Sequence, residues 1–224
     1  TQGRSSVIMD TGLPLTSGYS VRAHAGLLSF EYSFGRDRVI VNCGTSEVEG
    51  KWRNLLRATA AHSTLVLDNR NSCQFDEEGF LSSRPDVRSK RHEDDDVVMI
   101  DASHNGYVPR FGTTHRRYVG LREQGETLCG EERLTGRSGV PFTVHFHLHP
   151  GIQASLIQDG AEILLRAKSG MGWRFKAPDV KLSLEESIYA SEGEVPRRTL
   201  QIVLSGQTVT AATVLNWELR REKI

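Results

Sequence analysis

The sequence lacks an excess of either charge. Its 224 residues include 28 Lys and Arg and 28 Asp and Glu, so the formal net charge at pH 7 is zero. Proteins that bind nucleic acid or an anionic membrane surface usually carry a clear positive excess. The composition therefore gives no reason to expect such partners, and we predict neither a nucleic-acid ligand nor a membrane.

Cysteine is scarce, and no long apolar run is present. The three cysteines, Cys43, Cys73 and Cys129, include no Cys-x-x-Cys pair, so neither a disulfide framework nor a cysteine zinc site is predicted. No apolar run approaches the roughly 20 residues that a membrane-spanning helix needs. The first residue is Thr1 and no signal-peptide pattern follows it, so we expect a fragment of a longer chain.

What the sequence does contain is the apolar–polar alternation of β-strands. Residues 26–40 alternate, turn at Gly35-Arg36-Asp37 and resume as Val39-Ile40-Val41, which predicts a hairpin. Further strand-like segments cover residues 63–68, 97–101, 113–121, 127–134, 142–149, 163–167, 181–184, 199–204 and 214–219. Many short strands separated by turn residues predict an all-β fold, a large antiparallel β-sandwich with few or no helices.

Two segments depart from this pattern. Residues 51–61 are the only helix-compatible stretch, although clear caps are missing. Residues 84–96 form a run of basic and then acidic side chains. Such a run is typical of a solvated surface, so we predict an exposed loop or hairpin tip there.

Three histidines alternate within one predicted strand. His145, His147 and His149 are spaced at i, i+2 and i+4, which places their side chains on one face of the strand. Neighbours on one face stand about 7 Å apart, which is wide for three ligands of a single metal ion. A polar strip beneath a loop, with each imidazole hydrogen-bonded, is the favoured interpretation; a metal site or a polar cleft is the alternative.

Polar and aromatic residues also gather where a predicted strand ends, in the segment that contains His104, Asn105 and Tyr107. Sugars are often bound by such mixtures, because an aromatic ring packs on their C–H faces while planar polar groups bind their hydroxyls. An ordinary turn at Asn105-Gly106 is the alternative. His24 and His62 each precede a predicted strand, and either alone would more often be structural than a ligand.

Three short segments of the chain are similar to segments of a known protein family. Arg22-Ala-His24-Ala-Gly-Leu-Leu-Ser-Phe is similar to the family segment His-x-His-Ala-Asp-x-x-Ser-Phe. Val41-Asn42-Cys43-Gly44 is similar to its Ile-Asp-x-Gly strand end, and the segment from Arg57 to His62-Ser-Thr-Leu is similar to its Arg-Thr-x-x-His-Asn-Thr segment. These segments resemble the C-terminal β-sheet domain of the heparinase II/III-like polysaccharide lyases. The resemblance implies that residues 1–224 form a sandwich of the supersandwich type, without the family's N-terminal helical α/α toroid.

The resemblance also implies a zinc site. In metal-containing members two histidines and an Asp hold the ion, which places His24, Asn42 and His62 at the ligand positions. Asn42 departs from the pattern, because a neutral amide is a poor zinc ligand. Arg22 stands at the position of a substrate-site histidine, and Gly26 replaces the Asp of His-Ala-Asp. A guanidinium at position 22 can still bind a uronate carboxylate through two hydrogen bonds.

The function that the resemblance implies is β-elimination of a uronic-acid-containing glycan, for example a glycosaminoglycan. We predict catalytic roles for Arg22 and His62, and substrate contacts for Arg57, His104 and Tyr107. The expected partners are an acidic polysaccharide and the protein's own toroid, which supplies proton-transfer residues in the family; a periplasmic or cell-envelope location is implied. A non-catalytic carbohydrate-binding module and a purely structural domain are the alternatives.

Overall fold

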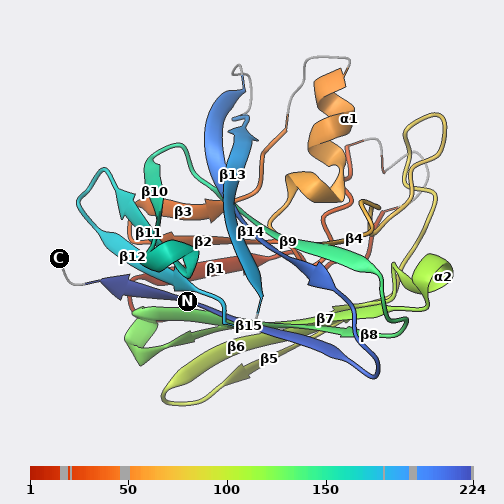
Figure 1. Cartoon of the computed structure of the whole chain (residues 1–224). Helices are drawn as coiled ribbons and strands as arrows, with labels where there is room; N and C mark the ends of the chain where they lie inside the picture. The colour runs from red at the N-terminus through yellow and green to blue at the C-terminus, as the bar shows by residue number, and fades with distance from the viewer. Residues whose placement is uncertain (16–19, 21, 46–50, 179, 192–195, 223–224) are drawn as a thin grey trace.

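Two antiparallel sheets form the molecule (Figure 1). The computed structural model describes residues 1–15, 20, 22–45, 51–178, 180–191 and 196–222. The first sheet has seven strands in the order β1-β2-β3-β9-β14-β13, with β4 paired to β9. Its strands are β1 (Ser5–Met9), β2 (Phe30–Phe34), β3 (Asp37–Val41), β4 (Leu65–Leu67), β9 (Pro141–Leu148), β13 (Lys181–Tyr189) and β14 (Arg197–Gln207).

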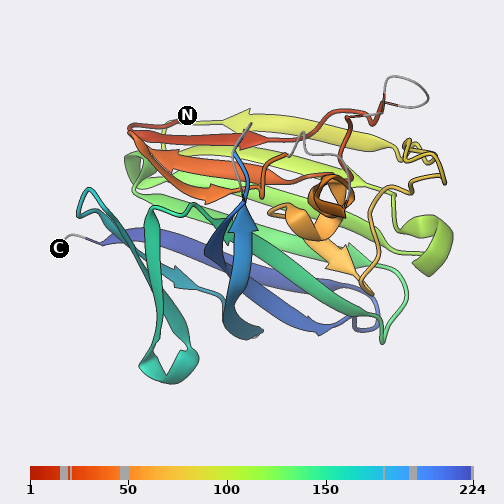
Figure 2. The same ribbon diagram turned by 90° about the horizontal axis from the view of Figure 1, so that it is seen from above.

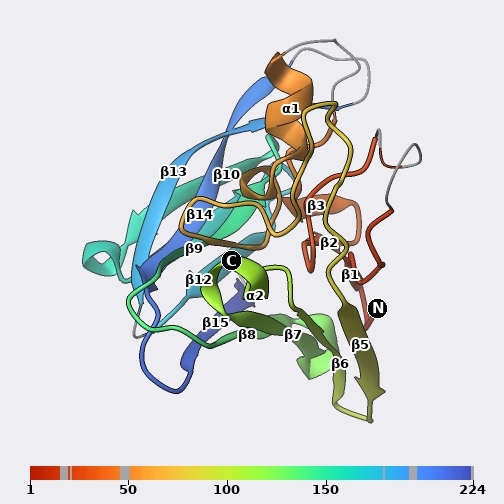
Figure 3. The same ribbon diagram turned by 90° about the vertical axis from the view of Figure 1, so that its right-hand side faces the viewer.

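The second sheet has eight strands in the order β10-β11-β12-β15-β8-β7-β6-β5. Its strands are β5 (Val87–Glu93), β6 (Val97–His104), β7 (Thr114–Arg122), β8 (Thr127–Thr135), β10 (Ile152–Ile157), β11 (Glu162–Ala167), β12 (Gly172–Lys176) and β15 (Thr213–Glu222). Figure 3 shows the two layers, with β5 to β8 and β15 in one and β9, β13 and β14 in the other. The predicted all-β sandwich is therefore confirmed.

Among the described residues, the named helical elements are short. These are α1 (Lys51–Arg57), α2 (Val108–Phe111) and the 3-10 turns η2 (Thr59–Ala61), η3 (Glu123–Gly125) and η4 (Gln158–Gly160). α1 lies on the side of the seven-stranded sheet that faces away from the other sheet (Figures 1 and 2). In the part of the chain that the structure describes, no helix has the length and hydropathy to cross a membrane.

Aromatic rings fill the space between the sheets. Phe30 and Phe146 come from the seven-stranded sheet, and Phe175 and Trp217 come from the eight-stranded one. The Trp217 indole stacks on Phe30 at a centroid distance of 5.6 Å and meets Phe146 edge-on at 4.9 Å. Trp217 lies across the backbone of Gly130, where an added Cβ would stand 2.2 Å from the ring. Glycine at position 130 is therefore required by the packing of this core.

The sequence predictions hold for most strands but not for all. The hairpin at Gly35 is confirmed, and its turn joins β2 to β3 with Gly35 at φ 60°. β1, β10 and β12 were not predicted, because each has only five or six residues and shows a weak alternation of its own. The acidic residues 94–96 form the predicted hairpin tip, whereas most of the charged run before them is the edge strand β5. Charged side chains protect such an edge against pairing with another chain.

Candidate active site

His24 and His62 form a hydrogen-bonded pair although 38 residues separate them. His24 lies in the segment that leads into β2, and His62 lies between η2 and β4. Nδ1 of His24 stands 3.0 Å from Nε2 of His62, and the two rings meet edge-on with centroids 5.1 Å apart. His24 is half-buried, whereas His62 is 6% exposed. The structure thus brings together two of the histidines that the sequence singled out.

The hydrogen bonds determine which ring nitrogen of each histidine carries the proton. Nδ1 of His62 lies 2.8 Å from the carbonyl oxygen of Ala58, which can only accept, so that nitrogen carries the proton. Nε2 of a neutral His62 is then an acceptor, and Nδ1–H of His24 donates to it. The remaining nitrogen, Nε2 of His24, then carries a lone pair that no described residue uses. His62 therefore orients His24, and His24 is the member that can accept a proton or bind a ligand.

Burial keeps both rings neutral at pH 7. It lowers the pKa of His62 to about 4, with His24 as a second cause. It also lowers the pKa of His24, where the positive charge of Arg57 adds to the effect. Desolvation disfavours the imidazolium form, which explains the direction of both shifts.

A network of hydrogen bonds to backbone carbonyls joins the two segments that carry the pair. Ala25 N–H donates to the carbonyl of Arg57, and the Arg57 Nε–H donates back to the carbonyl of Ala23. The hydroxyls of Thr59 and Thr64 donate to the carbonyls of Ala25 and Leu27, at 2.6 and 2.8 Å. These hydrogen bonds fix the two segments relative to each other and so hold the two imidazoles within hydrogen-bond distance.

Arg117 supports both segments from the opposite sheet. It lies on β7 and is fully buried, and its Nη1 donates to the carbonyls of Leu28 and Ser63 at 2.7 and 2.8 Å. Its Nε lies 2.8 Å from Oε1 of Glu132 on β8, which is also fully buried. Leu28 follows His24 by four residues and Ser63 follows His62 directly. One guanidinium thus holds both ends of the candidate site.

Asn42 lies next to this pair without facing it as a ligand. Its Oδ1 accepts a hydrogen bond from the backbone N–H of Ser63 at 2.9 Å. Within the described ranges, no three His, Cys, Asp or Glu side chains are grouped as a metal site requires. The facing nitrogens of His24 and His62 would suit two zinc ligands, but a neutral amide supplies no charge to balance the ion. The residues present therefore do not fit a zinc site, and no chemical step is derived through one.

The substitution Asn42→Asp is expected to create zinc affinity. A carboxylate beside two neutral imidazoles completes a donor set of the kind that zinc prefers. Isothermal titration with zinc should show one tight site in the variant and at most weak binding in the unchanged protein. Asn216→Asp, an exposed change on β15, is the matched control and should add no site. Tight stoichiometric zinc in the unchanged protein would contradict this expectation.

Gly26 provides the space that the His62 ring occupies. A Cβ added at Gly26 would stand 2.6 Å from Cδ2 of His62, which is closer than a real contact allows. An Asp at this position, as in the family segment, would collide with His62 as it is placed here. The side-chain arrangement of this pair is therefore specific to a chain with glycine at position 26.

The substitution Gly26→Ala is expected to displace the His62 ring and break its hydrogen bond to His24. The imidazole nitrogen signals of both residues in NMR spectra should shift, and the pKa of His24 should move because its acceptor is lost. Gly112→Ala serves as a control for a glycine with no atom within 4 Å of the added Cβ, although its φ of 62° adds backbone strain. Unchanged histidine signals in Gly26→Ala would show that the contact is not tight.

The two predicted arginines differ in exposure. Arg22 is exposed and lies two residues before His24, so it is free to contact a substrate. Arg57 is 5% exposed, and its guanidinium lies 4.6 Å from the ring centre of Phe75. Arg57 also borders a hollow of about 300 Å³ that includes Asn54 and Asn71. Substrate contact by Arg57 stays a prediction; in the structure, its Nε and Nη2 bind the carbonyls of Ala23 and Ser20.

His104 and Tyr107 lie inside the protein. Gly106 N–H donates to Nδ1 of His104, and Nε2 of His104 stands 3.2 Å from Nδ1 of His115. Nε2 of His115 then donates to Glu132 at 2.7 Å. The Tyr107 hydroxyl donates to the carbonyl of Leu65 at 2.9 Å. Both residues are at most 3% exposed, so their predicted substrate contacts would need a movement that the structure does not display.

The histidine strip on β9 matches the favoured structural interpretation. Nε2 of His147 donates to the carbonyl of Ala60 at 3.0 Å, so η2 covers this histidine. Nδ1 of His145 stands 2.9 Å from Oε1 of Gln201, and Nδ1 of His149 accepts from Gly151 N–H. Each imidazole of the strip therefore has a hydrogen-bond partner within the protein.

Arg117, His115 and Glu132 were missed at the sequence level. A signal was present on β7, since Val119 and Leu121 point inward and the same parity places His115 and Arg117 inward as well. Charged residues at inward positions of an amphipathic strand indicate a buried polar network. Their partner Glu132 could not be identified, because strand register is not visible in one sequence.

The comparisons with known proteins agree on the fold. Heparan sulfate lyase HepC from Pedobacter heparinus superposes with a TM-score of 0.79 at 15% identity, over 98% of this chain and 33% of that one. Heparinase III superposes with a TM-score of 0.72 at 12% identity, over 97% and 33%. At these identities the likeness shows a shared fold and nothing finer.

A sequence relative and a family model complete the comparison. FtsZ-localized protein C from Caulobacter vibrioides is 30% identical over 240 residues, which cover 98% of this chain and 41% of that protein. The chain thus spans less than half the length of each of these three proteins. Residues 1–218 match the family model described as heparinase II/III-like, C-terminal. The resemblance inferred from three short segments is confirmed, and the chain belongs to the heparinase II/III-like C-terminal family.

Proposed function

We propose that this polysaccharide-lyase-family domain forms one wall of a cleft in which a uronic-acid-containing glycan is cleaved by β-elimination. The observation that carries the proposal is the hydrogen-bonded pair of His24 and His62, which leaves Nε2 of His24 without a partner among the described residues. The exposed Arg22 precedes His24 by two residues. A neutral, oriented imidazole and a guanidinium from the same short segment suit proton transfer close to a carboxylate.

The chemistry divides among these residues as follows. β-Elimination breaks the C–H bond next to the uronate carboxylate and the glycosidic C–O bond on the adjacent carbon, and a C=C bond forms between the two carbons. Arg22 binds the carboxylate and stabilises the negative charge that develops there. His24 accepts or relays a proton through Nε2, while His62 holds the His24 ring. The remaining acid–base groups come from a helical toroid outside residues 1–224.

A non-catalytic glycan-binding or structural domain is the second candidate. Asn42 and Gly26 both depart from the family's segments, and the chain lacks the charged residues found there. The relative from Caulobacter vibrioides is named for its localisation with FtsZ, and the name contains no catalytic term. In that case the His24 and His62 pair would be a structural feature of the fold.

The full-length protein decides between these candidates. It should be incubated with heparan sulfate, hyaluronan, alginate and pectate, and the ultraviolet absorbance of the unsaturated product should be followed. We expect cleavage of at least one glycan, and a loss of about 100-fold or more in the variant His24→Gln. His92→Gln, an exposed histidine on β5, is the matched control and should retain full activity. Absence of unsaturated product from every glycan would exclude the lyase; glycan binding without cleavage would favour the second candidate.

A further inference from the structure

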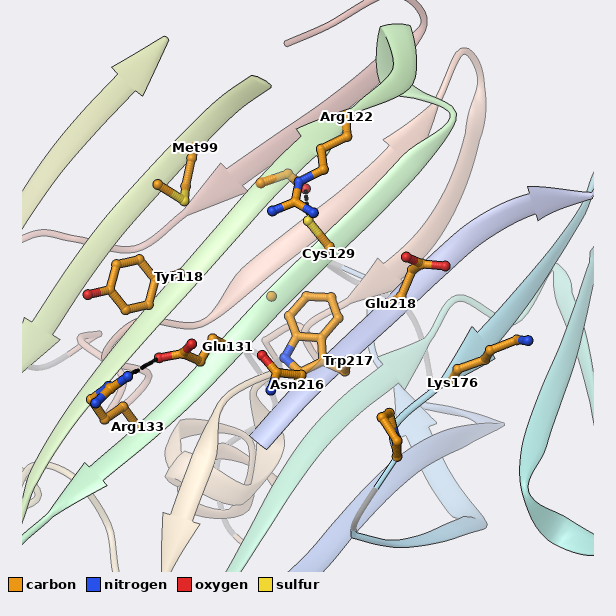
Figure 4. Close-up of a pocket in the computed structure, with 13 residues that line it drawn as sticks. Met99, Tyr118, Arg122, Cys129, Glu131, Arg133, Lys176, Asn216, Trp217 and Glu218 are labelled. Carbon is orange, nitrogen blue, oxygen red and sulfur yellow. Dashed lines mark hydrogen bonds and ion pairs between the residues drawn. The ribbon is translucent and has the colours of Figure 1, made fainter. Parts of the chain in front are cut away.

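A hollow of about 570 Å³ lies on the eight-stranded sheet, over strands β6, β7, β8, β12 and β15 (Figure 4). On β7, Val119 and Leu121 point into the core, so Tyr118 and Gly120 point outward. The hollow therefore opens on the face that turns away from the seven-stranded sheet, whereas α1 and η2 lie beyond the opposite sheet. Its volume falls within the roughly 300–1,000 Å³ that is typical of ligand pockets.

Gly120 keeps this hollow open, and no packing contact requires a glycine there. A Cβ added at Gly120 would meet Met99 Cβ and Val98 O at 3.6 Å and Cys129 Sγ at 3.7 Å, which are ordinary contacts. Its φ is not in the left-handed region. Glycine inside a strand weakens the strand and often marks a bulge, a tight bend or a close approach by a ligand or another backbone. Gly120 pairs in continuous register with Met99 and Cys129, so it does not mark a bulge. Gly120 thus differs from Gly130, where the Trp217 ring explains the glycine.

The side chains around the hollow suit a sugar ring. The aromatic ring of Tyr118 forms part of one wall, and Asn216 offers both a donor and an acceptor (Figure 4). Arg122 and Glu218 also line the hollow, and neither has an ion-pair partner within the described part of the chain. Planar polar groups that can bind pairs of hydroxyls, next to an aromatic ring, are the combination that recognises a pyranose.

The other charges at the rim are already neutralised. Nη2 of Arg133 lies 3.0 Å from Oε1 of Glu131, and the Lys176 ammonium lies 2.9 Å from Oε1 of Glu162. These pairs leave one guanidinium and one carboxylate available inside the hollow. Arg122 can pair with a carboxylate of a sugar unit, and Glu218 can accept hydrogen bonds from its hydroxyls.

We propose that this hollow, on the face opposite α1, binds a pyranose unit of a glycan and forms a second glycan site. The ligand class rests on the proposed function. A long glycan that is bound in the cleft near His24 and His62 has further sugar units, and one of them can bind in this hollow. The site itself rests on Gly120, the open volume and the planar polar groups. It would hold the glycan without taking part in bond cleavage.

The test uses the full-length protein, with a heparan sulfate hexasaccharide and neutral cellohexaose as probes. Affinity is measured by titration calorimetry for the unchanged protein and for Gly120→Val, which fills the hollow with a residue that strands favour. We expect Gly120→Val to weaken binding of at least one probe by about ten-fold or more, and to keep or raise the unfolding temperature. Arg122→Gln should weaken binding as well, whereas Arg88→Gln, an exposed arginine of β5 outside the hollow, should not.

Cys129 gives a readout that is confined to this site. Its half-buried free thiol lines the hollow, whereas Cys43 and Cys73 are buried. The rate of Cys129 alkylation, monitored by peptide mass spectrometry, should fall when the probe is added. The same fall is expected in the variant His24→Gln. Protection of Cys129 without any cleavage would support the second site and count against the lyase. Two results would overturn the second site. One is an unchanged probe affinity in Gly120→Val; the other is a change in the oligomeric state of Gly120→Val without a change in its probe affinity.

Discussion

Replacing Arg117 by methionine is expected to destabilise the domain by about 3–5 kcal/mol, because it leaves the Glu132 carboxylate buried without its guanidinium. Glu132 has no access to solvent, and its two oxygens accept hydrogen bonds from Arg117, His115 and Trp217. Such a loss is a large part of the roughly 5–15 kcal/mol that stabilises a typical domain. Urea unfolding followed by circular dichroism measures the change in the free energy of unfolding.

The adjacent residue provides the control for this experiment. Arg116 lies on the same strand but points outward, where it pairs with Asp101 and is 47% exposed. Arg116→Gln should therefore cost about 0–1 kcal/mol. The double variant Arg117→Met with Glu132→Leu should recover much of the lost stability, because it removes both buried charges. Equal losses for Arg116→Gln and Arg117→Met would refute the importance of the buried pair.

The free energy of unfolding is expected to fall steeply as the pH is lowered from about 6.5 to about 4. Burial lowers the pKa of His62 to about 4 and that of His147 to about 3, from 6.5 in each case. Between pH 6.5 and about 4, these histidines bind protons in the unfolded chain but not in the folded protein. The stabilisation is therefore complete above pH 6.5 and is lost progressively below it. His62 alone contributes on the order of 3 kcal/mol.

The buried network on the other sheet acts in the same direction. Burial also lowers the pKa values of His104 and His115, and each ring accepts a hydrogen bond that a second proton would abolish. The pKa of Glu132 is lowered because Arg117 and His115 outweigh its burial, so its contribution is lost at still lower pH.

Urea titrations at several pH values check this expectation. His147→Gln should flatten the dependence of the unfolding free energy on pH, because it removes one of the perturbed groups. The exposed His92→Gln should leave that dependence unchanged. A free energy of unfolding that stays constant between pH 7 and about 4.5 would contradict neutral buried histidines.

Local patterns in the sequence were enough to predict the fold class. Alternation placed most strands, and Gly35 marked the first hairpin, because these features depend on neighbouring residues. β1, β10 and β12 were not predicted because each is short and its alternation is weak, although β10 and β12 both pair with their neighbour β11. The pair of His24 and His62 was found only through the family resemblance, since no local spacing connects residues 38 positions apart.

The positions of His104 and Tyr107 could not be predicted from one sequence. His104 and Tyr107 were chosen because polar and aromatic residues follow a strand, yet in the structure both lie inside the protein. The difference arises because the Tyr107 hydroxyl bonds the Leu65 carbonyl of the other sheet and His104 bonds the buried His115. The pattern of one strand does not reveal such contacts with other strands. The direction of the proton in the His24 and His62 pair likewise depends on the Ala58 carbonyl, which only the folded chain brings close.

The two hydrogen bonds from Nη1 of Arg117 have a consequence for folding order. They close chain segments of 89 residues to Leu28 and 54 residues to Ser63. Contacts of such long range form late, since the entropy of closing the chain must be overcome before they contribute. The segments before β2 and β4 can therefore reach their final arrangement only after the two sheets have docked. The proximity of His24 and His62 is then a marker of completed folding, and a partly folded chain with both sheets formed but undocked would lack the site.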